Sequence, residues 1–102
     1  NIRGHIFTAL SLRERLGLEP NQDTSLEMYL SFEYGDENYC LVVDEVGDVL
    51  TPDLNSFEDT PTTLNENWKS ISSGIYKLDQ KLMIILDIDK VFGNLNNNNN
   101  KQ

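Results

Sequence analysis

Strict alternation of apolar and polar side chains over residues 26–34 is the feature that most constrains the fold. In LEMYLSFEY, one side of an extended chain carries the apolar set Leu26, Met28, Leu30, Phe32 and Tyr34, and the other carries Glu27, Tyr29, Ser31 and Glu33. A period of two maintained over this length is a strong strand signal. The turn-forming residues GDEN and the β-rich run YCLVV come next, so we predict a β-hairpin.

A second hairpin is predicted near the end of the chain. Its strands are WKSISSGIYKL (68–78) and KLMIILDI (81–88), joined by a turn around Leu78–Lys81. The run Leu82–Leu86 is apolar on both faces, which is typical of a strand in the centre of a sheet.

Two further stretches are predicted to be extended. One is a strand over Ile2–Leu10. The other is DEVGDVL (44–50), in which Gly47 marks a bulge or a close approach of another backbone. A long connection punctuated by Pro52 and Pro61 follows. About five strands without an alternation of strands and helices predict a mainly β protein, as a barrel or a sandwich piece.

Two short helical segments are predicted beside the strands. Ser11 and Glu14 match a capping box, in which the Ser hydroxyl accepts a hydrogen bond from the third helical amide. Gly17 suits the left-handed position after that helix. Asp87 can cap a last helical turn that Gly93 ends.

The charge and the cysteine content argue against several classes of function. The net charge is −9 and the basic residues are not clustered, which argues against binding to nucleic acid or to anionic membranes. No apolar run approaches the ~20 residues of a membrane span, and no signal peptide is visible. The lone Cys40 fits a reducing compartment, and burial in its apolar strand would keep the thiol protonated.

No motif in the chain indicates catalysis. His5 is the only histidine and lies at no ligand-like spacing from a cysteine or carboxylate. The acidic clusters Asp44–Asp48 and Asp87–Asp89 do not match a calcium loop, and there is no glycine-rich phosphate loop. A carboxylate pair for glycoside chemistry lacks the pattern of an aromatic-lined cleft. We therefore expect no enzyme, no catalytic residue, no metal and no cofactor.

Three stretches in register resemble the CheW family of bacterial chemotaxis adaptors. They are NIRGHIFTALSLRERLGL, YCLVVDEVGDVL and GIYKLDQKLMIILDIDKVF, and the resemblance extends from Asn1 to about Phe92. The chain departs from the family pattern at Thr8, where proline is frequent, and at Ser11, where aspartate is usual. At Gln80 it also lacks the turn glycine of the family.

The resemblance implies a fold of paired small five-stranded β-barrels, similar to SH3-like or OB-like barrels, with two short helical segments. Residues 1–93 are expected to be one CheW-like domain that lacks the N-terminal strands of the family. Residues 94–102, rich in Asn, are expected to be a disordered tail. Missing strands would leave unpaired edges, so we also expect a homodimer or strand exchange with a second copy.

By resemblance, the function is that of a non-catalytic cytoplasmic adaptor at the inner-membrane chemoreceptor array. Its partners would be the regulatory domain of the histidine kinase CheA and the cytoplasmic tip of a methyl-accepting chemoreceptor. Arg3 matches the family's interface arginine and offers a planar fork for carboxylates, with an internal ion pair to an acidic side chain that holds the loop as the alternative. Gly4 serves backbone conformation, Asn1 bonds the turn, and Val46 and Val49 line the partner-binding groove, with core burial as the alternative for both valines.

Two other readings stay open from the sequence. The chain could be a CheW-like domain of a larger signalling protein, either the CheA regulatory domain or a CheV-type adaptor. The reading that differs most in class is a small-ligand-binding or enzymatic β-barrel.

Overall fold

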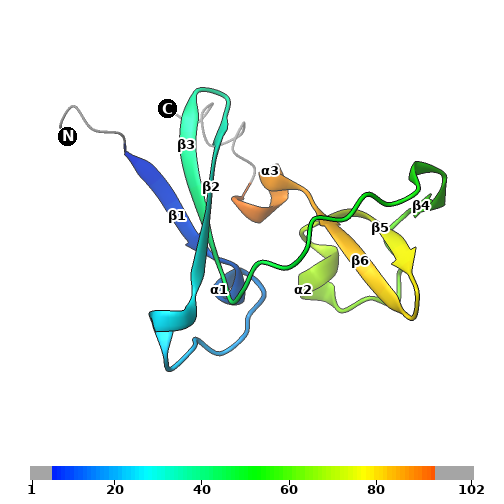
Figure 1. The fold of residues 1–102 in the computed structure, drawn as a ribbon, viewed down its shortest axis with the longest axis horizontal. Helices are drawn as coiled ribbons and strands as arrows, with labels where there is room; N and C mark the ends of the chain where they lie inside the picture. Colours follow the sequence, from blue (N-terminus) through cyan, green and yellow to red (C-terminus); the bar gives the residue numbers. More distant parts are fainter. Residues whose placement is uncertain (1–5, 94–102) are drawn as a thin grey trace. The chain divides into compact units, whose positions relative to one another are not determined.

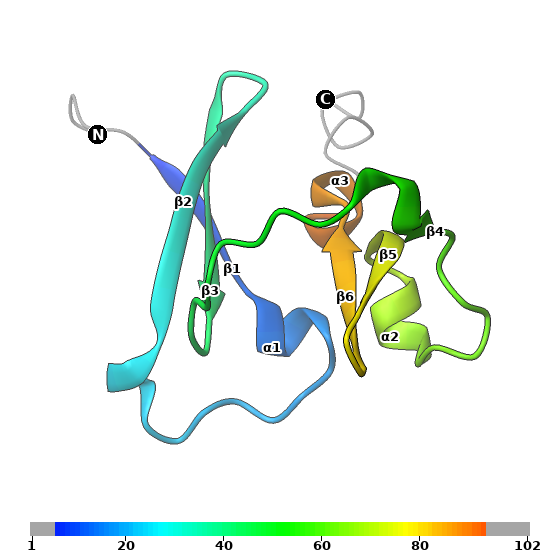
Figure 2. The same ribbon diagram turned by 45° about the vertical axis from the view of Figure 1, so that its right-hand side comes forward.

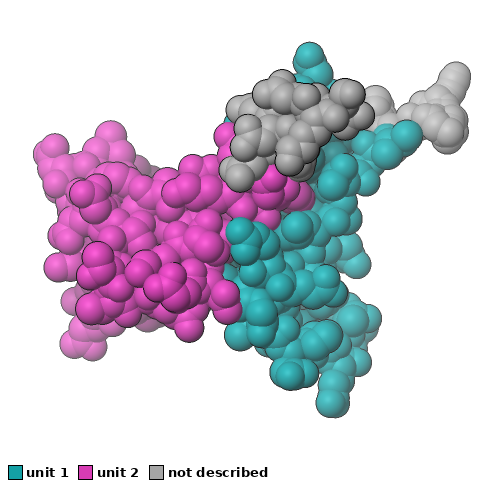
Figure 3. Space-filling view, turned by 180° about the vertical axis from the view of Figure 1, so that it is seen from behind, with its two compact units in different colours: residues 1–48 teal, residues 49–102 magenta. Residues whose placement is uncertain are grey.

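The structure is a computed structural model that describes residues 6–93 of the chain. It divides into two compact units, with residues 1–48 in the first and 49–102 in the second (Figure 3). Six strands form two three-stranded sheets, one in each unit, with three four-residue α-helices and two short 3₁₀ turns among the described residues (Figure 1). The mainly β prediction is confirmed.

The first sheet is built around β3 (Glu37–Val43). The strand β2 (Met28–Tyr34) pairs with it antiparallel, and β1 (Phe7–Ser11) pairs with its other edge in parallel (Figure 2). The buried apolar side chains of this unit are Leu16, Tyr39 and Leu41, two of which come from β3. β3 therefore supplies both the central ladder and much of the core of the unit.

The predicted first hairpin is confirmed, including its turn. Gly35 and Asp36 join β2 to β3, and both have positive φ, at 58° and 67°. Positive φ at both residues of a two-residue loop matches the right-handed twist of the flanking strands. This turn sets the register of the hairpin, in which Leu30 lies opposite Leu41.

Both predicted helix starts are confirmed. The hydroxyl of Ser11 accepts from the Glu14 amide (3.3 Å) before α1 (Leu12–Arg15), and Gly17 follows the C-cap residue Leu16 with φ of 74°. The Asp87 carboxylate accepts from the Lys90 amide before α3 (Ile88–Val91), and Gly93 follows with φ of 82°. Short polar side chains and glycine satisfy the amides and carbonyls that helix ends leave unpaired.

The second sheet has the order β4-β5-β6. β5 (Ser72–Leu78) pairs antiparallel with β6 (Lys81–Leu86) and with the two-residue strand β4 (Phe57–Glu58). The fully buried apolar side chains of this unit are Ile71, Ile75 and Val91. The second predicted hairpin is confirmed, but its first strand begins at Ser72 and its second ends at Leu86. Gln80 lies in its turn and has φ of 62°.

Four details of the sequence reading are wrong. The run Leu82–Leu86 lies in β6, which is at the edge of its sheet and not in the centre, because only β5 pairs with it among the described residues. Residues 44–50 form no strand. Trp68 does not begin a strand, because Asn65 caps the helix α2 (Glu66–Lys69) by accepting from the Asn67 amide. Gly47 marks neither a bulge nor a close approach, since a Cβ placed there meets no atom within 4 Å. The bulge lies in β5 between Ser72 and Gly74. The remaining predictions for residues 1–5 and for the tail 94–102 lie outside the described residues.

Gly74 is the glycine whose missing side chain the fold requires. Its φ is 156°, and a Cβ placed on it would fall on the ring of Phe57 and 2.9 Å from the Glu58 carbonyl oxygen. The Phe57 ring meets Tyr76 edge-on at a centroid distance of 5.2 Å. An aromatic side chain on β4 thus occupies the space that the glycine leaves on β5.

We predict that Gly74→Ala lowers the free energy of unfolding by about 2–4 kcal/mol, because it combines overpacking with an unfavourable φ. Gln80→Gly, in the same hairpin, should instead raise it by roughly 0.5–1 kcal/mol, because glycine adopts positive φ without strain. Urea unfolding measures both changes. Equal stability of Gly74→Ala and the parent chain would contradict the close approach of Phe57.

Candidate protein-binding surface

One face of β2 carries four apolar side chains, of which three are exposed to solvent and Phe32 is half-buried. We call Met28, Leu30, Phe32 and Tyr34 the β2 apolar row. Met28 is 44% exposed and Leu30 is 42% exposed. Within the row, the Phe32 ring stacks on the buried Tyr39 of β3, with ring centroids 5.8 Å apart. An exposed apolar row on an ordered strand is typical of a surface that binds protein.

The chain after β3 continues the apolar exposure. Residues 44–53 contain no helix or strand, and we call them the connecting segment. Val46 is 45% exposed and Val49 is 96% exposed, so neither is a core residue. The Val46 amide donates to Sδ of Met28 at 3.3 Å, which places the backbone of the connecting segment against one end of the β2 apolar row.

Of the five residues predicted from the sequence, the structure describes Val46 and Val49. Asn1, Arg3 and Gly4 lie outside the described residues. Val46 belongs to the first unit and Val49 to the second. The β2 apolar row was not singled out as a binding surface, because its alternation fits a buried face equally well. The sequence holds no signal that distinguishes the two, because the opposite side of β2 is mostly polar in either case.

A polar network fixes the start of the connecting segment. Arg13 Nε donates to Asp44 Oδ1 at 2.9 Å, and its Nη1 donates to the Glu19 carbonyl oxygen at 2.7 Å. Asn21 Nδ2 lies within hydrogen-bond distance of the same Asp44 oxygen (3.0 Å) and of Glu27 Oε2 (3.2 Å). These contacts tie α1 and the loop before β2 to the residue that follows β3.

The network shifts the ionisation of both charged partners. The hydrogen bond from Arg13, reinforced by the one from Asn21, holds the pKa of Asp44 below its usual range. The same hydrogen bond raises the pKa of the Arg13 guanidinium above its ordinary value. Both changes mean that the ion pair is favoured in the folded protein. Asp44 therefore has a partner within the first unit, and the sequence reading did not foresee Arg13 in that role.

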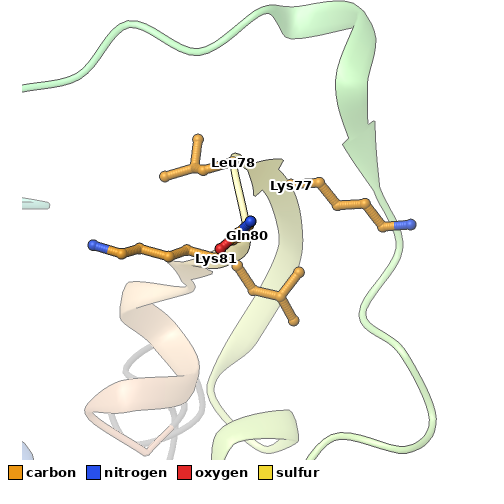
Figure 4. Close-up of a pocket in the computed structure, with 5 residues that line it drawn as sticks. Lys77, Leu78, Gln80 and Lys81 are labelled. Carbon is orange, nitrogen blue, oxygen red and sulfur yellow. The ribbon is translucent and has the colours of Figure 1, made fainter.

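A shallow hollow lies at the tip of the β5–β6 hairpin. Its volume is about 300 Å³, and it is lined by Lys77, Leu78, Gln80, Lys81 and Leu82 (Figure 4). Lys77 Nζ lies 3.7 Å from Glu58 Oε1 on β4. All the lining side chains come from one hairpin, so the hollow is a surface feature of that turn.

Residues 6–93 offer neither a metal site nor a membrane-spanning helix. Within that range, no three His, Cys, Asp or Glu side chains gather closely enough to hold a metal ion. No helix in the same range is long and apolar enough to cross a membrane.

We predict that Asp44→Asn lowers stability most at neutral pH. The pKa of Asp44 is lower in the folded protein than in the unfolded chain, where it is about 4. The contribution of Asp44 to the free energy of unfolding is therefore present above a pH of about 4 and is lost as the pH falls through the folded-state pKa. Urea unfolding at a series of pH values should show the parent and the variant converging in acid. Asp48→Asn, which removes the same charge from the same segment, controls for the change in net charge. A difference that stays constant with pH would contradict the ion pair.

Comparison with known proteins places these features in context. Residues 1–96 match the model of the CheW-like domain family. The chain is 25% identical over 91 residues to a protein named chemotaxis protein CheW from Helicobacter pylori, and 28% identical over 91 residues to the protein of that name from Bacillus subtilis. Each match covers 89% of this chain and 54% or 58% of the relative, so the chain spans little more than half the length of these curated relatives.

A solved structure agrees with the sequence match. The crystal structure of the scaffolding protein TtCheW from Thermoanaerobacter tengcongensis superimposes with a TM-score of 0.73 at 29% sequence identity, covering 91% of this chain and 63% of that one. Sequence and fold thus lead to the same family, and the family predicted from the three motifs is confirmed. The chain belongs to the CheW-like domain family.

Proposed function

We propose that this chain acts as a non-catalytic adaptor in bacterial chemotaxis signalling and couples chemoreceptors to the histidine kinase CheA. The observation that carries the proposal is the match of residues 1–96 to the CheW-like family. Two relatives are named chemotaxis proteins, and the similar solved structure is titled a scaffolding protein. Work of this kind requires surfaces that bind other proteins and requires no reacting group.

The exposed apolar side chains of the first unit support the proposal. The β2 apolar row and Val46 present carbon surface to solvent, and Glu27 and Asp44 lie close by in the polar network. An apolar centre with a polar rim is the usual composition of a protein interface. The surface would meet the regulatory domain of CheA or the cytoplasmic tip of a receptor, in the cytoplasm at the receptor array.

We predict that Arg3→Glu weakens binding to a receptor tip or to the CheA regulatory domain by at least roughly tenfold, about 1.4 kcal/mol. Charge reversal replaces a guanidinium that can hold a carboxylate in two parallel hydrogen bonds. Arg3→Lys keeps the charge without the planar fork, so its affinity should lie between those of the parent chain and of Arg3→Glu. Isothermal titration calorimetry measures the affinities, and circular dichroism checks the fold. Unchanged affinity in a folded Arg3→Glu chain would remove Arg3 from the interface.

We predict a similar loss for Val46→Asp and for Val49→Asp, because each would place a charge in an apolar contact. Both side chains are exposed, so the variants should keep the stability of the parent chain. Leu54→Asp is the matched control, since Leu54 is 78% exposed in the same long connection and the family resemblance gives it no role. If all three variants lose affinity equally, the loss comes from the added negative charge, and the two valines do not contact the partner.

A further inference from the structure

The strand β2 is an edge strand that lacks the usual protection against pairing. It bonds to β3 along one side, and no described strand lies along its other side. An edge presents a row of backbone N–H and C=O groups, which natural proteins guard with lysine, proline, a bulge or a short strand. β2 is seven residues long, reads MYLSFEY, and pairs with β3 without a register shift.

The other edges of the two sheets are less open. β6 begins with Lys81, and its residues from Met83 to Leu86 are half-buried. β4 has two residues, and β1 has five, of which the last two are half-buried. In β2, by contrast, Tyr29 is 65% exposed and Leu30 is 42% exposed, so both faces of the strand can be reached. β2 is therefore the edge on which an added strand meets the least obstruction.

We propose that β2 pairs with β2 of a second copy of this chain, antiparallel and centred on Ser31. This register sets Leu30 opposite Phe32 and Met28 opposite Tyr34 of the second copy, so that the β2 apolar rows of the two copies form one continuous strip. On the other face, Tyr29 lies opposite Glu33, and the two Ser31 side chains face each other. The product is a six-stranded sheet with the order β1-β3-β2-β2-β3-β1.

The occupant is a second copy because β2 complements itself in sequence and charge. Directly opposed apolar pairs stabilise an antiparallel ladder, and like charges directly opposed destabilise it. The register about Ser31 brings no two charges directly opposite one another within β2. The nearest like charges are Glu27 and the Glu33 of the second copy, which are diagonal neighbours on one face. Glu27 is held by Asn21 at 3.2 Å on its own chain.

Charge sets the strength and the salt dependence of this pairing. Each copy carries −9, so two copies repel one another. Salt screens that repulsion within about 8–10 Å at physiological ionic strength. The dimer is therefore weak at low salt and is favoured by added salt, which is the reverse of an association held by opposite charges.

The test is sedimentation equilibrium of the full chain from about 10 µM to about 1 mM, a range that brackets a weak dimer. The chain should shift from monomer to dimer with concentration, and more readily at high salt than at low salt. A chain that stays monomeric throughout this range at high salt overturns the proposal.

Variants at one charge pair test the register. Tyr29→Glu sets a glutamate opposite Glu33 at two symmetric places, which should weaken the dimer roughly tenfold. Adding Glu33→Lys to Tyr29→Glu sets opposite charges there and should restore it. Leu54→Glu adds the same charge on the second unit and should leave association unchanged. If Tyr29→Glu has no effect, or if the double variant does not recover, the β2 pairing is wrong even where a dimer exists.

Discussion

The first unit depends on the pairing of β3 with a strand on each side. β3 bonds antiparallel to β2 and parallel to β1, and it buries Tyr39 and Leu41. Burial of two such side chains stabilises the fold by roughly 1.5–3 kcal/mol each. Since β3 holds the centre, β2 can be ordered on one side while its apolar row and its outer edge stay open. The features proposed for binding follow from that arrangement.

The start of the connecting segment is also positioned by β3. Asp44 follows β3 directly, and its bonds from Arg13 and Asn21 hold the start of the segment. Val46 then lies with its amide on Met28 Sδ. An ion pair on the surface contributes little to stability by itself, but here it determines where the chain leaves the sheet. Its role is thus to position the apolar residues that follow it.

Local features were readable from the sequence. The alternation over residues 26–34 predicted β2, the turn residues predicted the hairpin, and Ser11 and Asp87 predicted two helix starts. Each of these depends on neighbours close in the chain. The three motifs also predicted the family, because their order and spacing are more specific than any one of them.

Features set by distant contacts were not readable. The parallel pairing of Phe7 with Asn38 and the bond from Arg13 to Asp44 join residues that are 31 positions apart. The periodicity of apolar residues along the chain does not indicate which distant residues come into contact. The helix at Asn65 was missed because Trp68 and the residues after it resemble a strand, and tertiary context can override that propensity. Val46 and Val49 illustrate the same limit, since residue type alone does not distinguish a core valine from an exposed one.

The β2 apolar row and the connecting segment are the surfaces that we propose to bind other proteins. The most direct measurement is an amide NMR titration of the full isotope-labelled chain with a receptor tip and with the CheA regulatory domain. We expect the largest changes in chemical shift on residues 28–34 and 44–50 with at least one of the two partners. Changes confined to the β5–β6 hairpin, or no change with either partner, would contradict this proposal.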